Sequence, residues 1–390
     1  MEGKLHIYHP KRRLPLFEYT PSSSPNSSST SKADRVNVLV FIGGLFDNFR
    51  GTGYVDDLAS LFPRNTPNQA WTVMHAQLSS AIRGWGTSDL NRDVEEMAAA
   101  IRYIRTSISQ SESTNIVLMG HSTGCQDVLH YLYSTPPDHR PRPAIQGAIL
   151  QAPVSDREGI LHTITSTPSR KPLYDQCLSL ANTVPESEHR TTILPMHWTT
   201  PLIGAAPVSI SRFLSLASPD SPSNPGLDDL FSSDLPDSRL DATFGQIASS
   251  PSLEAIRSHN GTASLSKSIL ILTSGADEYV PPQIDKPRLL SRWKSAIESH
   301  PSATTHAILD PSSVVIPHAR HDISGTTLVH RKARLVDMRS AVLHYLDRVV
   351  GSISPATWQI LAADTAEIER EMKESGSPAA ALQGVQDMKL

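Results

Sequence analysis

The sequence predicts an α/β protein with a mostly parallel central sheet and helices on both faces of that sheet. Apolar, β-branched runs typical of buried strands recur along the 390 residues, and segments with helical periodicity separate most of them. The clearest strand, residues 35–42 (RVNVLVFI), is almost continuously apolar, as strands buried on both faces are. Regular alternation of strands and helices favours parallel pairing.

The other expected strands are short and rich in apolar residues, and they comprise residues 4–8, 14–20, 71–76, 116–119, 145–151, 268–273 and 303–309. A helix is expected over residues 88–107, where Leu90, Val94 and Met97 begin an apolar stripe and Ser88 is placed to cap the start. Two later stripes predict helices near residues 335–349 and 358–372.

Residues 155–265 interrupt this alternation, because they rarely sustain a strand and contain many prolines, for example in 218–225 (SPDSPSNP). The segment comes after the sixth expected strand, so it is predicted to be a cap over the carboxyl ends of the strands. The core would then comprise residues 1–154 and 266–390. Within it, the Ser/Pro-rich residues 21–34 are expected to form a flexible loop.

The overall composition indicates a soluble protein that binds neither nucleic acid nor membranes. Charged residues make up 19%, the net charge is −4, no basic stripe occurs, and no apolar run approaches the roughly 18 residues of a membrane span. The two cysteines, Cys125 and Cys177, make no disulfide framework, which favours the reducing cytoplasm. The first 17 residues hold no apolar core of a secretory signal, and the final Met-Lys-Leu is a weak variant of the peroxisomal Ser-Lys-Leu.

A nucleophile motif lies between an expected strand and an expected helix. Gly120-His121-Ser122-Thr123-Gly124 follows the apolar run 116–119 and precedes the helical segment 125–133. A Gly-x-Ser-x-Gly sequence in that setting is the nucleophile elbow of the α/β-hydrolases, in which a tight turn exposes the serine hydroxyl. Glycines two residues before and after Ser122 let the strand and the helix cross closely. We therefore predict an α/β-hydrolase fold with Ser122 as the nucleophile.

A serine nucleophile needs a histidine base and a carboxylate that orients the histidine, in the chain order Ser, Asp or Glu, His. Asp277 lies just past the apolar strand 268–273 and is our preferred acid. Glu278 is its neighbour and a weaker candidate. Asp156 is a stronger rival because it follows the end of strand 145–151, although a residue there could instead cap a helix at the entry to the cap.

Two histidines, His318 and His321, follow the last strand signal, and His321 is the better base because it lies further into the loop that should return over Ser122. Both histidines together with Asp322 could suggest a metal site, but no second histidine or cysteine cluster completes one. We therefore predict neither a metal nor a cofactor.

The tetrahedral intermediate of acyl transfer also needs two backbone donors for its oxyanion. The amide of Thr123, directly after the nucleophile, is the first expected donor. Gly43-Gly44-Leu45 follows strand 35–42, and its two glycines would let the Leu45 amide approach the substrate as the second donor.

Several of these segments together resemble a known family. They are residues 43–45 (GGL), the 78–88 loop with Trp85, the elbow, residues 151–158 (QAPVSDRE), and Asp277 with His321. The chain resembles fungal and plant α/β-hydrolases formerly described as a conserved domain of unknown function, and within them the siderophore esterases that open fusarinine C. The resemblance covers about residues 39–346.

The resemblance implies cytosolic hydrolysis of ester bonds in a hydroxamate siderophore, with release of its iron. The candidate substrate-binding residues are Gly44, Trp85, Asp156, His197 and Trp198. The sequence departs from many hydrolases at His318, where they place glycine. A carboxylesterase, thioesterase or lipase acting on another ester, and a ligand-binding protein without turnover, are the alternatives.

The second half of the expected cap carries the aspartates Asp220, Asp228, Asp229, Asp234, Asp237 and Asp241 and few basic residues. This excess of negative charge suggests attraction of a substrate that bears free amines. A solvated acidic loop is the alternative interpretation.

Overall fold

The computed structural model describes residues 2–20, 37–62, 71–136, 141–257, 265–301, 306–324 and 328–351, together with a few positions between 363 and 374. The predicted loop 21–34, most of the predicted helix 358–372 and the final tripeptide lie outside the described residues. Within the described ranges, no helix is both long enough and apolar enough to cross a bilayer.

The strands form one sheet in the order β1-β2-β4-β3-β5-β6-β8-β10, and β7 and β9 also pair with β8. Pairing is parallel from β4 through β10, whereas β1, β2 and the short β7 pair antiparallel. The strands are β1 Glu2–His9, β2 Leu14–Thr20, β3 Asn37–Ile42, β4 Trp71–Ala76, β5 Ile116–His121, β6 Gly147–Gln151, β7 Ile256–Arg257, β8 Leu265–Ser274, β9 His306–Leu309 and β10 Val314–Ile316. The predicted α/β fold with a mostly parallel sheet is confirmed.

The central strands divide the core into two layers. Every residue of β3, β5 and β6 is buried, which explains why these strands are apolar without a break. Successive side chains of β3 point to opposite faces: Val38 and Val40 belong to one hydrophobic cluster, whereas Leu39 and Phe41 belong to the other. Each face of the sheet therefore needs its own cover of helices.

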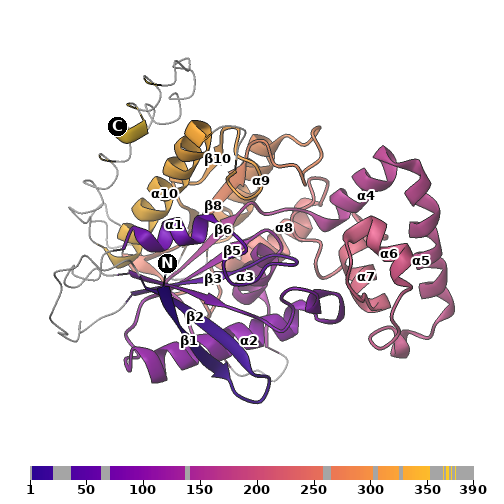
Figure 1. Cartoon of the computed structure of the whole chain (residues 1–390), viewed down its shortest axis with the longest axis horizontal. Coiled ribbons are helices and arrows are strands. Elements are labelled where there is room, and N and C mark those ends of the chain that lie inside the picture. The colour runs from indigo at the N-terminus through magenta and orange to yellow at the C-terminus, as the bar shows by residue number, and fades with distance from the viewer. Residues whose placement is uncertain are drawn as a thin grey trace.

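Helices from different parts of the chain provide these covers (Figure 1). On the first face lie α2 Leu90–Tyr103, α3 Gly124–Tyr133 and α9 Lys286–Glu298, and on the second lie α1 Tyr54–Ser60 and α10 Leu328–Val350. The predicted N-cap residue of α2, Ser88, is wrong by one position, because the N-cap is Asp89. The side chain of Asp89 accepts the Arg92 N–H at the helix start, while the Ser88 hydroxyl bonds Asp93 at 2.9 Å.

A separate layer of helices follows β6 and stands to one side of the sheet (Figure 1). It comprises α4 Asp156–Ser166, α5 Lys171–Thr183, α6 Met196–Ile203 and α7 Ile210–Ala217, which share a third hydrophobic cluster. We call α4 to α7 the helical cap. The later part of the predicted insertion packs elsewhere, because α8 Asp237–Thr243 and the following turn Phe244–Ile247 join the first core cluster.

Candidate active site

The turn between β5 and α3 holds Ser122 in a left-handed backbone conformation, with φ of +56°. Its N–H donates to the Gln151 carbonyl at 3.1 Å, which anchors the turn to the end of β6. A Cβ at Gly120 would lie 2.3 Å from the Gly124 carbonyl oxygen, and one at Gly124 would lie 2.4 Å from that of Ile42. Only glycine fits at both positions, so the local geometry has the features of a nucleophile elbow.

The loops after β8 and β10 bring Asp277 and His321 together. Nδ1 of the His321 ring lies 2.8 Å from one carboxylate oxygen of Asp277, and the other oxygen accepts the Tyr279 N–H at 3.0 Å. Both side chains are buried. Because a carboxylate can only accept, the hydrogen on the His321 ring lies on Nδ1, and Nε2 is free to take a proton.

Glu278 contacts the same histidine in a different way. Its carboxylate accepts the His321 backbone N–H at 3.0 Å and forms an ion pair with Arg320 at 3.2 Å. The two consecutive acids thus hold different parts of one residue: Asp277 holds the ring and Glu278 holds the main chain.

The rival acid, Asp156, makes a different contact. It is the first residue of α4, which follows the N-cap residue Ser155. Its carboxylate accepts a hydrogen bond from the Gln126 side chain at 2.6 Å. Burial raises the pKa of Asp156 to about 6. This arrangement joins the start of the helical cap to α3.

A small cavity beside the elbow is lined by Gly44, Leu45 and Thr123. A Cβ on Gly44 would lie 2.7 Å from the Ser122 Cβ, so only glycine lets the loop after β3 approach the serine this closely. The two residues predicted to donate to an oxyanion therefore line one cavity next to the predicted nucleophile.

The other candidate substrate-binding residues do not all line this cavity. Trp85 also lines this cavity, but it is only 1% exposed and packs within the hydrophobic cluster of the helical cap. His197 is exposed and Trp198 is half-buried, and both belong to α6, with ring centroids 5.6 Å apart. Neither of these two nor Asp156 is among the described residues that line the cavity.

His318 adopts φ of +55°, in the left-handed region that favours glycine. The predicted departure from many hydrolases therefore falls at a position where the backbone is strained for a histidine. The side chain is exposed and forms part of the turn that leads to His321.

Buried acids surround Arg212, which comes from α7. The Arg212 guanidinium bonds the Asp228 carboxylate at 2.5 Å, and Asp93 and Asp127 line the cavity together with it. Burial raises the pKa of Asp93 to about 7 and raises the pKa of Asp127 well above its ordinary value. Burial therefore favours the neutral form of these two acids.

The raised pKa of Asp93 predicts a dependence of stability on pH. The folded state holds its proton up to about pH 7, whereas the unfolded chain releases it near pH 4. The contribution of Asp93 to stability is therefore complete below about pH 4 and is lost as the pH rises to about 7. We expect the free energy of unfolding of the wild type, minus that of Asp93→Asn, to fall by about 1.4 kcal/mol per pH unit in that window. Urea unfolding from pH 4 to 8 measures this difference, and two parallel curves would contradict it.

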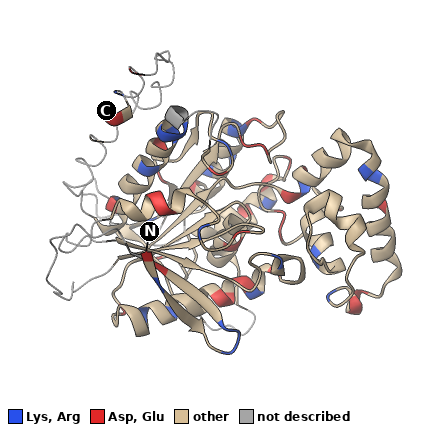
Figure 2. Ribbon diagram, viewed as in Figure 1, with Lys and Arg blue, Asp and Glu red and all other residues tan. Residues whose placement is uncertain are grey.

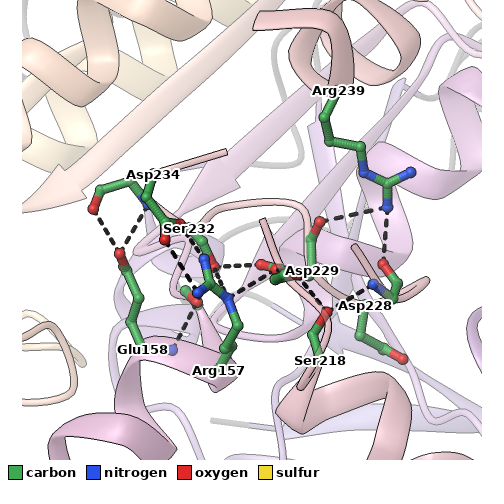
Figure 3. Close-up of polar contacts among 12 residues, drawn as sticks. Arg157, Glu158, Ser218, Asp228, Asp229, Ser232, Asp234 and Arg239 are labelled. Atoms are coloured by element: carbon green, nitrogen blue, oxygen red, sulfur yellow. Dashed lines mark hydrogen bonds and ion pairs between the residues drawn. The ribbon is translucent and has the colours of Figure 1, made fainter. Parts of the chain in front are cut away.

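Five of the six aspartates named in the expected cap contact basic side chains. Asp228 bonds Arg212, Asp229 bonds Arg157 at 2.9 Å, Asp234 also pairs with Arg157, Asp237 pairs with Arg292 at 2.7 Å, and the His300 ring bonds Asp241 at 2.8 Å. Figure 3 shows Arg157 between Asp229 and Asp234. Figure 2 shows acidic and basic residues mixed along the ribbon. These contacts reduce the free negative charge of five of the six aspartates, and attraction of an amine-bearing substrate stays a hypothesis.

Sequence reasoning missed two residues at the site, Gln151 and Tyr279. The Tyr279 ring packs edge-on against the His321 ring, with centroids 4.8 Å apart, although the tyrosine is 62% exposed. Gln151 contacts the turn of the nucleophile and the loop of the base. A polar residue that ends an otherwise apolar strand was the available signal for Gln151.

Comparison with known proteins shows similarity over nearly the whole chain. A family model described as "Protein of unknown function (DUF1749)" matches residues 1–346. Fusarinine C esterase sidJ of Aspergillus fumigatus is 36% identical over 88% of this chain and 98% of its own length. Esterase AN6793 of Emericella nidulans is 36% identical over 86% of this chain and 90% of its own length.

Among solved structures, the siderophore hydrolase EstB from Aspergillus fumigatus matches with a TM-score of 0.68 and 35% identity, over 90% of this chain and 98% of that chain. The sheet, the elbow and these relatives identify an α/β-hydrolase fold and a carboxylic ester hydrolase. The chain therefore belongs to the DUF1749 family.

Proposed function

We propose that this protein is a serine esterase that hydrolyses ester bonds of a hydroxamate siderophore of the fusarinine C type. The observation that carries the proposal is the contact of 2.8 Å between Asp277 and His321 in a chain that also presents Ser122 on a strained elbow. The substrate class is supported by relatives that match across nearly their full length, one named a fusarinine C esterase and one a siderophore hydrolase.

In the proposed mechanism, Nε2 of His321 takes the proton of the Ser122 hydroxyl as its oxygen attacks the ester carbonyl carbon. Asp277 keeps the histidine in the required tautomer and stabilises its positive charge. The amides of Leu45 and Thr123 donate to the oxyanion of the tetrahedral intermediate.

Collapse of this intermediate breaks the ester bond, and His321 returns the proton to the leaving alcohol. The acyl group is then attached to Ser122. A water molecule, deprotonated by His321, attacks this acyl-enzyme and releases the carboxylic acid. The reaction needs no cofactor, and any iron enters as part of the substrate.

The proposal places the reaction in the cytoplasm, where opening the siderophore would release iron for the cell. Both cysteines, Cys125 and Cys177, are buried and free, as expected in a reducing compartment. Microscopy of the full-length protein with an internal tag would test this location, and concentration in the secretory pathway would contradict it.

The direct test is mass spectrometry of ferric fusarinine C incubated with the purified protein and, in parallel, with Ser122→Ala. We expect linear fragments and monomers that have gained water from the wild type alone. If both reactions left the ligand intact while the wild type hydrolysed simple esters, the natural substrate would be an ester other than the siderophore. Equal cleavage by both proteins would exclude Ser122 as the nucleophile.

A further inference from the structure

Gln151, the last residue of β6, contacts the backbone of both predicted catalytic loops. It is completely buried. Its main-chain carbonyl accepts the Ser122 N–H at 3.1 Å, and its side-chain Nε2 donates to the His321 carbonyl oxygen and to Ser274 Oγ, each at 3.4 Å. Ser274 ends β8, the strand that leads to Asp277. One residue thus joins the chain segments that present the nucleophile, the base and the acid.

The other side-chain atom of Gln151, Oε1, lies 2.8 Å from the Tyr54 hydroxyl and 2.5 Å from Nδ1 of His121. The orientation of this amide follows from its surroundings. The His321 carbonyl oxygen can only accept a hydrogen bond, so the amide nitrogen must face it, and Oε1 must then face Tyr54 and His121.

This orientation sets the protonation of the His121 ring. Because Oε1 can only accept, the hydrogen of His121 must lie on Nδ1, and Nε2 must be bare. Burial lowers the pKa of His121 to about 3, so the ring stays neutral.

His121 lies directly against the predicted base. Its ring centroid is 4.8 Å from that of His321, with 47° between the two planes, and the exposed Tyr279 ring lies 4.8 Å from His321 as well. The position of the His321 ring therefore depends on where its neighbour His121 is held. Gln151 holds both: it bonds the His121 ring and the His321 main chain.

We infer that Gln151 is a positioning residue, which orients the base relative to the nucleophile by bonding the His321 main chain and by fixing the tautomer and place of the His121 ring. This inference rests on the proposed function, because it assigns Gln151 a role in the reaction of Ser122 and His321. Gln151 is buried beneath the site and acts through these neighbours rather than on the substrate.

The test compares Gln151→Met, which keeps length and removes every side-chain hydrogen bond, with Gln146→Met. Gln146 precedes the same strand at its other end, where its side chain accepts the Ile116 N–H at 2.7 Å. The substrate is an ester that the wild type hydrolyses. We expect Gln151→Met to lower kcat about 10-fold to 100-fold, because a small misplacement of a reacting group slows the reaction by about this factor. KM should change less than about two-fold. We expect Gln146→Met to leave kcat unchanged.

A second measurement needs no substrate. Nitrogen NMR of ¹⁵N-histidine-labelled wild type should show His121 protonated at Nδ1 and bare at Nε2 near neutral pH, and Gln151→Met should show a mixture of the two tautomers. A wild-type His121 protonated at Nε2, or an unchanged kcat in folded Gln151→Met, would overturn the inference. If the wild type showed the expected His121 tautomer but hydrolysed no ester, that result would instead contradict the proposed function.

Discussion

Replacing Asp277 with asparagine is expected to lower kcat by about 10⁴-fold while the protein stays folded. The carboxylate accepts from Nδ1 of His321 at 2.8 Å and from the Tyr279 N–H at 3.0 Å. An asparagine amide has the same size, but its NH₂ group can face the ring. It then stabilises the tautomer with hydrogen on Nε2, which cannot take the proton of Ser122. Steady-state hydrolysis of a simple ester, with circular dichroism to check folding, measures this effect.

Asp156→Asn is the matched control, because the sequence leaves both aspartates as possible acids. Asp156 bonds the Gln126 side chain rather than the predicted base. Asparagine can still accept that bond through its carbonyl oxygen, so kcat should change less than about ten-fold. A large loss in Asp156→Asn combined with a small loss in Asp277→Asn would reverse the assignment of the acid.

Replacing Gly124 with alanine is expected to destabilise the protein by about 3 kcal/mol or more and to abolish ester hydrolysis. The new Cβ would lie 2.4 Å from the Ile42 carbonyl oxygen and 2.8 Å from that of Gly43. Both neighbours are backbone atoms at the end of β3, so they cannot move aside as a flexible side chain can. Relief requires α3 to shift away from the sheet, which also moves Ser122 and the amide of Thr123. Urea unfolding and ester hydrolysis measure the two effects.

Gly159→Ala provides the control for the glycine-to-alanine change itself. Gly159 lies within α4, and a Cβ there would meet nothing closer than the Tyr279 carbonyl oxygen, at 3.8 Å. Alanine favours helices over glycine, so we expect stability to rise by about 0.5 to 1 kcal/mol with activity retained. Wild-type stability and activity in Gly124→Ala would show that the packing of α3 against the end of β3 tolerates a methyl group.

The sequence determined the features that depend on neighbouring residues. Strand β3 could be predicted because burial on both faces requires an apolar residue at every position, and α2 because its apolar residues repeat with the helical period. The turn around Ser122 was predictable because a short glycine motif between a strand and a helix defines it locally. The pairing of Asp277 with His321 was predicted from the chain order of the fold and their places after strand ends, and the structure places these two side chains in contact.

Only the tertiary structure decided which distant groups meet. Arg157 pairs with Asp229 and Asp234, more than 70 residues later, and a count of acidic residues in the sequence does not reveal these contacts. Gln151 reaches Tyr54, 97 residues earlier, and His321, 170 residues later. Local sequence patterns predict burial and turn geometry, because these depend on the residues themselves and their near neighbours. The partner of a buried polar group depends on how the strands and helices pack, and that information is spread over the whole chain.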